Sequence, residues 1–155
     1  MEKGTGANVL VMDATNLATS KQSTRRGLRF GLWTAQVVLA VMFGTAGVLK
    51  TTQPIADLAQ QLRWPGAVPP PLVRFIGTAE LLGAIGLVLP AATRIKPSLT
   101  PLAAGGLVTV MALAAAFHLT RGELGAIAFN AILGVVAAFV AWGRYRGAPI
   151  SPRGS

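Results

Sequence analysis

The chain has 155 residues, of which 52% are hydrophobic and only 12% are charged. Soluble domains carry roughly 25% charged residues, so this composition argues against intrinsic disorder and against an ordinary soluble enzyme, and the mean hydropathy of +0.57 indicates a membrane protein. The absence of cysteine excludes disulfides and thiolate metal ligands, and a single histidine argues against a self-contained zinc or haem site.

The first segment, residues 1–29, is polar and rich in Thr, Ser, Asn and Gly, and we expect it to be a flexible cytoplasmic tail. Its twin arginines, Arg25 and Arg26, would also suit a bacterial export signal. The apolar run that follows is long for a signal core, however, and three more runs come after it. At the other end of the chain, residues 147–155 are expected to form a second flexible tail.

Four long apolar runs lie between these tails and define one transmembrane domain over residues 30–146. A helix needs roughly 20 apolar residues to cross about 30 Å of hydrocarbon. Three of the runs carry no charge, and the remaining one has Arg74 near its start and Glu80 inside it. We therefore predict an all-α, integral membrane four-helix bundle, with spans at residues 30–49, 72–90, 98–119 and 124–143.

The longest connection, residues 50–71, contains a helical pattern of its own. Ile55, Leu58 and Leu62 share one helical face, and Pro54 suits the start of a helix. This pattern predicts a short amphipathic helix in the first outer loop, lying on the membrane surface or capping the bundle. We interpret the segment as a structured linker, and the alternative is a lid over a substrate site.

Positive charges are divided unequally between the two ends of the predicted bundle. Of the Lys and Arg residues that lie close to the spans, nine are on the side of both termini and four on the other, so the positive-inside rule places both termini in the cytoplasm. The charge excess therefore indicates topology and not nucleic-acid binding, since no basic run is interleaved with base-stacking aromatic residues. The nine are Lys21, Arg25, Arg26, Arg29, Arg94, Lys96, Arg144, Arg146 and Arg153, and the four are Lys50, Arg63, Arg74 and Arg121.

The polar residues of the spans gather in one outer layer, and the inner halves are nearly free of polar side chains. From the helical rise, Glu80 lies about 12 Å and Asn130 about 9 Å below the outer end of their spans. Lys50, Arg74 and His118 lie near span ends on the same side. An unpaired carboxylate at this depth costs on the order of 3 kcal/mol. These five residues are the candidate ligand or proton site, and the alternative is a polar network that only fixes the packing.

Small residues predict where two of the spans meet. Gly and Ala at helical spacing let two helices approach closely. We expect the small-residue face of the second span, which also carries Glu80, to pack on that of the first span and so to bring Lys50 towards Glu80. The small residues are Gly77 and Ala84 on the second span, and Ala40, Gly44, Gly47 and Thr51 on the first.

These motifs resemble those of the DoxX-like membrane proteins. Residues 43–50 resemble the F-x-x-A-G-x-x-K ending of that family's first helix, and residues 76–87 its second-helix signature, which begins I-G-x-x-E-L-x-G. The turn at 94–101, His118, Asn130 and residues 141–144 follow in the same order, so the resemblance covers residues 30–146. It implies a four-helix protein of the bacterial inner membrane. The family name comes from a small subunit of a quinone-reducing, thiosulfate-oxidising complex, and other relatives are linked to membrane redox assemblies or chaperone-like roles.

Three functions are compatible with these features. The first is a non-catalytic subunit or accessory factor of a membrane redox or assembly complex, in contact with lipid and with a protein partner or a second copy, because the chain carries no catalytic motif. The second is a quinone- or lipid-binding oxidoreductase component that uses Glu80, His118 and Asn130. The third is a small transporter, ranked last because the inner halves of the spans offer no polar path. The residues themselves predict no cofactor; a quinone belongs to the second function.

Overall fold

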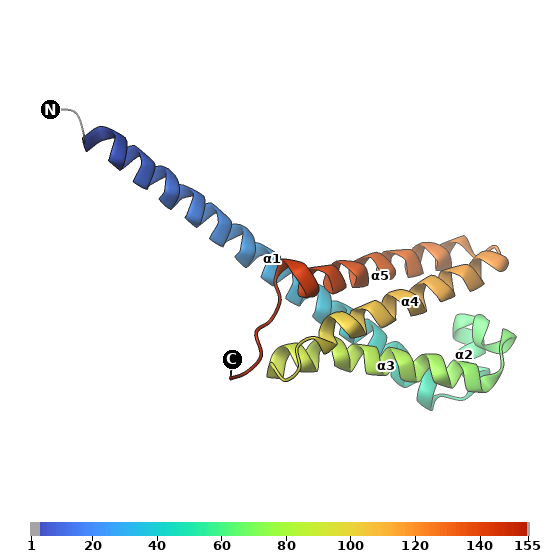
Figure 1. Cartoon of the computed structure of the whole chain (residues 1–155). Helices are drawn as coiled ribbons and strands as arrows, with labels where there is room; N and C mark the ends of the chain where they lie inside the picture. The colour runs from blue at the N-terminus through green and yellow to red at the C-terminus, as the bar shows by residue number, and fades with distance from the viewer. Residues whose placement is uncertain (1–3, 155) are drawn as a thin grey trace.

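The computed structural model describes the backbone of residues 4–154 and the side chains of residues 20 and 22–154 (Figure 1). The described chain is helical and contains no strand. Four of its helices are long and apolar enough to cross a membrane, which confirms the predicted all-α class and the four spans. The elements are α1 (Gly4–Thr52), α2 (Ile55–Leu62), η1 (Trp64–Ala67), α3 (Pro70–Thr93), α4 (Leu99–Thr120), α5 (Leu124–Trp142) and a final π-helical turn, η2 (Gly143–Gly147).

The first helix is much longer than the predicted span. Instead of starting near Phe30, α1 begins at Gly4 and runs without a break to Thr52, so that its N-terminal part projects beyond the other helices (Figure 1). The first proline of the chain is Pro54, and nothing before it interrupts the ladder of backbone hydrogen bonds. Within the segment that the sequence predicts to be a flexible tail, the backbone of residues 4–29 is helical.

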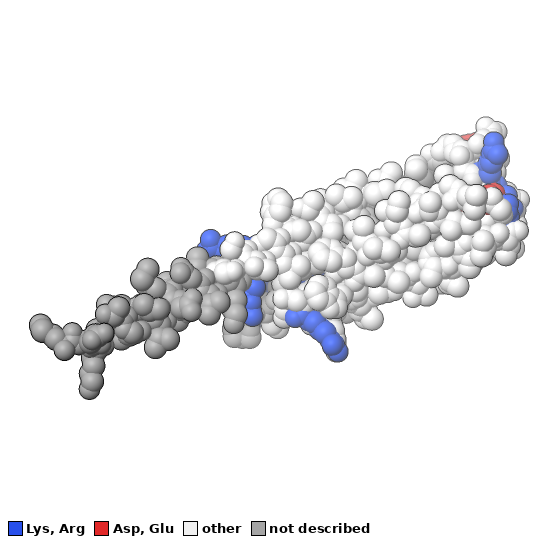
Figure 2. Space-filling view, turned by 90° about the horizontal axis from the view of Figure 1, so that it is seen from above, with Lys and Arg blue, Asp and Glu red and all other residues white. Residues whose placement is uncertain are grey.

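The bundle is assembled from two close helix pairs, α1 with α3 and α4 with α5, and α3 also packs on α4. Large apolar side chains from all four long helices fill the centre, among them Phe43, Leu87, Leu107 and Leu133. Many others point outwards and are exposed, such as Phe75 (70%) and Val135 (69%). Lys and Arg side chains appear at the two ends, with an uncharged body between them (Figure 2). An apolar outer surface between charged ends is the pattern of a helical bundle in contact with lipid.

Glycines set the distance between α1 and α3. A Cβ atom on Gly47 would lie 2.7 Å from the carbonyl oxygen of Gly77, and one on Gly77 would lie 2.6 Å from the Cβ of Lys50. Both are closer than real Cβ contacts, so the two backbones can touch only because neither residue has a side chain. One turn earlier in α1, Gly44 faces the Cβ of Ala84. The small-residue faces of the first two spans thus meet in the structure.

The helix expected in the first outer loop is present as α2 and closes one end of the bundle. It starts directly after Pro54 and ends at Arg63, whose left-handed backbone (φ 62°) reverses the chain into η1. Leu58 of α2 and Pro65 of η1 are buried. The α2–η1 segment is therefore anchored on the bundle by apolar contacts. We call this end of the molecule the α2 end and the other, which holds η2 and the C-terminus, the η2 end.

Candidate functional site

Lys50 and Glu80 form a buried ion pair at the α2 end. Lys50 lies in the last turn of α1 and Glu80 lies in α3, and the close approach of these helices at Gly47 and Gly77 brings them together. The Lys50 ammonium is 2.6 Å from both carboxylate oxygens of Glu80. Only 8% of Lys50 and 3% of Glu80 are exposed. The carboxylate of Glu80 is therefore paired, as its depth in the bundle requires.

Arg74 does not reach Glu80. It is the first charged residue of α3, and its guanidinium donates hydrogen bonds of 2.5 Å and 2.7 Å to the backbone carbonyls of Lys50 and Gln53. The last carbonyls of a helix have no partner within the helix, and a cation is favourable there because it faces the negative end of the helix dipole. Arg74 therefore caps the end of α1 and holds in place the turn that carries Lys50.

His118 lies in the last turn of α4, and its partners come from the connection that follows this helix. Its Nδ1 lies 2.5 Å from a carboxylate oxygen of Glu123, and the other oxygen of Glu123 accepts a 2.8 Å hydrogen bond from Nε of Arg121. The hydrogen bonds from His118 and Arg121 hold the pKa of Glu123, which lies in the connection between α4 and α5, below its ordinary value. With an ionised carboxylate on Nδ1, the proton of a neutral imidazole sits on that nitrogen, and Nε2 is left as an acceptor.

Asn130 is the polar residue of α5 at this level. It is buried, with 8% of its surface exposed. Among the residues that the structure describes, no hydrogen bond to its side chain amide is formed. Its amide atoms are not among the fully buried polar atoms that lack a partner, so they remain accessible to a small molecule. The amide of Asn130 therefore has hydrogen-bonding capacity to offer a ligand or water.

Two cavities of about 290 Å³ and 300 Å³ lie among these side chains. The first, of about 290 Å³, opens between α3 and α4, past Phe75 and Leu113, and the second lies between α1 and α5, past Phe43 and Phe129. The walls of both are mainly apolar. Six residues line both cavities: Lys50, Trp64, Glu80, Met111, His118 and Asn130. Four of the five residues that the sequence singled out therefore line the same two cavities. The fifth, Arg74, contacts the end of α1 instead.

Trp64 is the site residue that sequence reasoning missed. The sequence suggests an interfacial aromatic anchor at this position, but η1 turns its ring inwards to line both cavities, and Lys50 Nζ lies 5.6 Å from the ring centroid. Glu123 was also not among the candidate site residues. Its signal in the sequence was the spacing of five residues from His118, which carries the chain past the end of α4 and back onto the imidazole.

The η2 end holds a buried polar pair that the sequence analysis did not anticipate. Nε of Arg144 donates a 2.5 Å hydrogen bond to the side chain oxygen of Gln36, and the amide nitrogen of Gln36 donates to the carbonyl of Leu87. Gln36 is fully buried and Arg144 is 4% exposed. The inner halves of the spans are thus less apolar than expected, because a single Gln inside an apolar run gives no sign of a partner more than 100 residues away.

The comparison with protein families matches the DoxX-like family over residues 34–140, which is more than half of the chain. The protein belongs to the DoxX-like family. The match confirms the resemblance seen in the motifs, and it includes Lys50, Arg74, Glu80, His118 and Asn130. The DoxX-like region ends before Arg144 and η2. Searches of curated proteins and of solved structures returned no match.

Proposed function

We propose that this DoxX-like protein is a ligand-binding subunit of a membrane redox or assembly complex. In this proposal its ligand is an apolar molecule with a small polar ring, of the quinone class. The observation that carries the proposal is the pair of cavities around Lys50, Glu80, His118 and Asn130. Binding sites for small molecules are mainly apolar concavities of roughly 300–1,000 Å³ with a few converging polar groups.

The side chains present suit a quinone ring. The amide of Asn130 would donate a hydrogen bond to one carbonyl oxygen, and Nε2 of His118 would exchange a proton at the other. The Lys50–Glu80 pair would give the cavity wall a polar surface of fixed geometry, since each charge holds the other in place. A quinone, when bound, supplies two-electron chemistry and takes up protons on reduction. Glu123 lies against Nδ1 of His118 and would hold the imidazole in a fixed orientation beside the ring.

A protein partner is part of the proposal because the residues themselves supply no source of electrons. Within residues 22–154 no three metal-ligating side chains come together, and the chain has no cysteine. The partner protein would therefore supply the electrons, and this chain would bind the ligand within the membrane. A transporter is less well supported. The apolar core of Leu39, Phe43, Leu87 and Leu107 separates the polar site from the Gln36–Arg144 pair at the η2 end.

Tryptophan fluorescence tests the proposed site directly. Trp64 lines both cavities, whereas Trp33 and Trp142 lie at the η2 end. A Trp33→Phe/Trp142→Phe background therefore reports on the cavities alone. Titration with a short-chain quinone is expected to quench this fluorescence to saturation. Replacing Asn130 by Leu removes the hydrogen bond at nearly constant volume and should weaken binding about tenfold, or about 1.4 kcal/mol.

The matched control is Ala131→Leu, an exposed position next to Asn130 on the same helix, which should leave binding unchanged. Quenching that does not saturate, or that is equal in the Asn130 and Ala131 variants, would overturn the quinone site. Mass spectrometry of gently solubilised native particles tests the partner. A stoichiometric second protein is expected, and a particle containing this chain and lipid alone would contradict the subunit role.

A further inference from the structure

Arg144 is buried at the η2 end with part of its hydrogen-bonding capacity unused. Its Nε is held by Gln36 and its guanidinium lies 5.3 Å from the ring centroid of Trp33. Its Nη2 atom is buried and has no partner among the described residues. A buried guanidinium is costly unless an anion or several acceptors compensate its charge. No carboxylate does so here, because the described ion pairs all lie at the α2 end.

Four more arginines line a groove together with Arg144. The groove has a volume of about 810 Å³ and lies between the start of the membrane-crossing part of α1, the end of α3 and the segment after η2. Arg94 fixes the far wall, since its Nε donates to the carbonyl of Ser151 and its own carbonyl accepts from the backbone of Arg153. No acidic side chain lines the groove. Five like charges in one groove repel one another unless an anion joins them. They are Arg25, Arg29, Arg94, Arg144 and Arg146.

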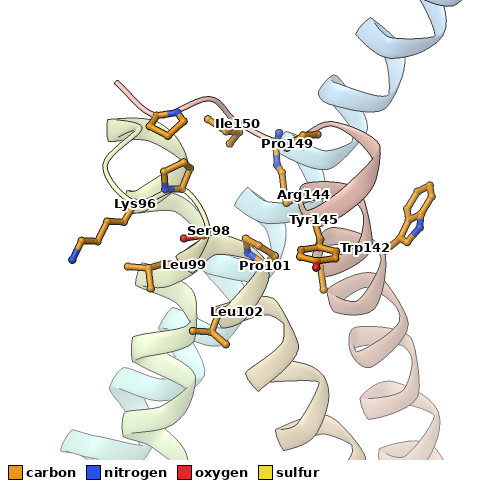
Figure 3. A pocket seen from close by; sticks show the side chains of 13 residues that line it. Lys96, Ser98, Leu99, Pro101, Leu102, Trp142, Arg144, Tyr145, Pro149 and Ile150 are labelled. Atoms are coloured by element: carbon orange, nitrogen blue, oxygen red, sulfur yellow. The ribbon is translucent and has the colours of Figure 1, made fainter. Parts of the chain in front are cut away.

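A second groove also begins at Arg144, but its lining is mostly apolar. Its volume is about 940 Å³, and it shares Arg144, Pro149 and Ile150 with the arginine groove. Figure 3 shows Arg144 under the C-terminal segment, with Leu99 and Leu102 on one side and Tyr145 and Trp142 on the other. The lining between the start of α4 and the end of α5 is mostly apolar, with Lys96 at its edge.

We infer that the two grooves together form a binding site for one anionic phospholipid at the η2 end. The arginines would bind the phosphate and the charged headgroup, and the apolar groove would hold an acyl chain along α4 and α5. Arginine forks match phosphate oxygens, and basic pockets between membrane helices on the cytoplasmic side suit anionic headgroups. A free phosphate would use only the first groove, and a nucleic acid would leave the apolar groove empty. The inference does not depend on the proposed quinone site, which lies at the opposite end.

Native mass spectrometry of the detergent-purified full chain tests the site. The protein is titrated with phosphatidylglycerol or with phosphatidylcholine of equal chain length. We expect one phosphatidylglycerol to bind at least tenfold more tightly than phosphatidylcholine. Arg29→Gln/Arg146→Gln removes two groove arginines and should weaken phosphatidylglycerol binding about tenfold or more, since each basic residue near an anionic surface contributes about 1 kcal/mol. Arg29→Lys/Arg146→Lys keeps the charge and should retain the preference.

The matched control is Arg26→Gln/Arg63→Gln, which removes two exposed arginines that do not line the groove. It should change binding less than twofold, and the melting temperature of each variant shows that the fold is intact. Equal binding of the two lipids, or an equal loss in the control, would overturn the inference. Inorganic phosphate and a six-carbon-chain phosphatidylglycerol identify the source of the anion. Phosphate that competes as well as the long-chain lipid would reassign the site to a free anion.

Discussion

At the level of single residues, the ion pair between Lys50 and Glu80 is what makes a charged layer tolerable inside the bundle. Both residues are more than 90% buried, so each charge depends on the other for compensation. Removing one partner leaves a buried charge without compensation and lowers stability, whereas replacing both partners by apolar groups of similar size often leaves stability unchanged. The pair therefore gives this site a fixed geometry more than it gives the bundle stability.

This asymmetry predicts the outcome of a double-mutant cycle. Lys50→Met leaves the Glu80 carboxylate without its partner and should destabilise the bundle by about 3–5 kcal/mol. Lys50→Met/Glu80→Met removes both charges and should recover most of that loss. Unfolding in mixed detergent micelles, followed by circular dichroism, measures each free energy. If the loss of unfolding free energy in the double variant equals the sum of the losses in Lys50→Met and Glu80→Met, the pair is not coupled as described.

The Glu123 carboxylate should make stability depend on acid pH. Because hydrogen bonds from His118 and Arg121 lower its pKa in the folded state below the ordinary value of 4.5, its stabilising effect is complete above that value and disappears as the pH falls through the lowered one. Glu123→Gln should therefore melt at a lower temperature than the wild type at pH 7, with the difference shrinking below pH 4.5. Melting curves from pH 7 to pH 3 check this, and a constant difference would contradict it.

At the level of elements, the contact between α1 and α3 places Lys50 opposite Glu80. Gly47→Ala would put a methyl group 2.7 Å from the Gly77 carbonyl oxygen, so the helices must separate. We expect a loss of about 1–3 kcal/mol and a weaker quinone response at Trp64. Gly44→Ala, one turn earlier on the same face, has 3.7 Å to Ala84 and serves as the control. Equal effects of the two substitutions on melting temperature would show that glycine as such, and not the close contact, is important.

At the level of the whole molecule, the distribution of charge predicts orientation. Nine basic residues at the η2 end against four at the α2 end should place the η2 end in the cytoplasm. The chain has no cysteine, so Ser98→Cys at the η2 end and Gln61→Cys in α2 each introduce a single exposed thiol. A membrane-impermeant thiol reagent should label Gln61→Cys in intact spheroplasts and Ser98→Cys only in inverted vesicles. The reverse pattern would invert the topology and place the arginine groove in the outer leaflet.

Several features of the fold and the site follow from local properties of the chain. Hydropathy over about 20 residues identifies a span, and distance along a helix gives depth, so Glu80, His118 and Asn130 could be placed in one layer. Small residues at helical spacing pointed to the contact of α1 with α3. The eight-residue helix α2 followed from its own periodicity.

What the sequence alone determined was thus membrane location, family, the number of spans and the level at which polar groups gather. The tertiary structure decided which groups pair: Lys50 with Glu80, Arg74 with the end of α1, and Gln36 with Arg144. It also turned Trp64 inwards and set the five groove arginines together. The physical reason is that these helices are apolar all round, since one side faces lipid and the other the core. No polar stripe then marks the inward face, and the rotation of each helix is fixed only by its packing against the others.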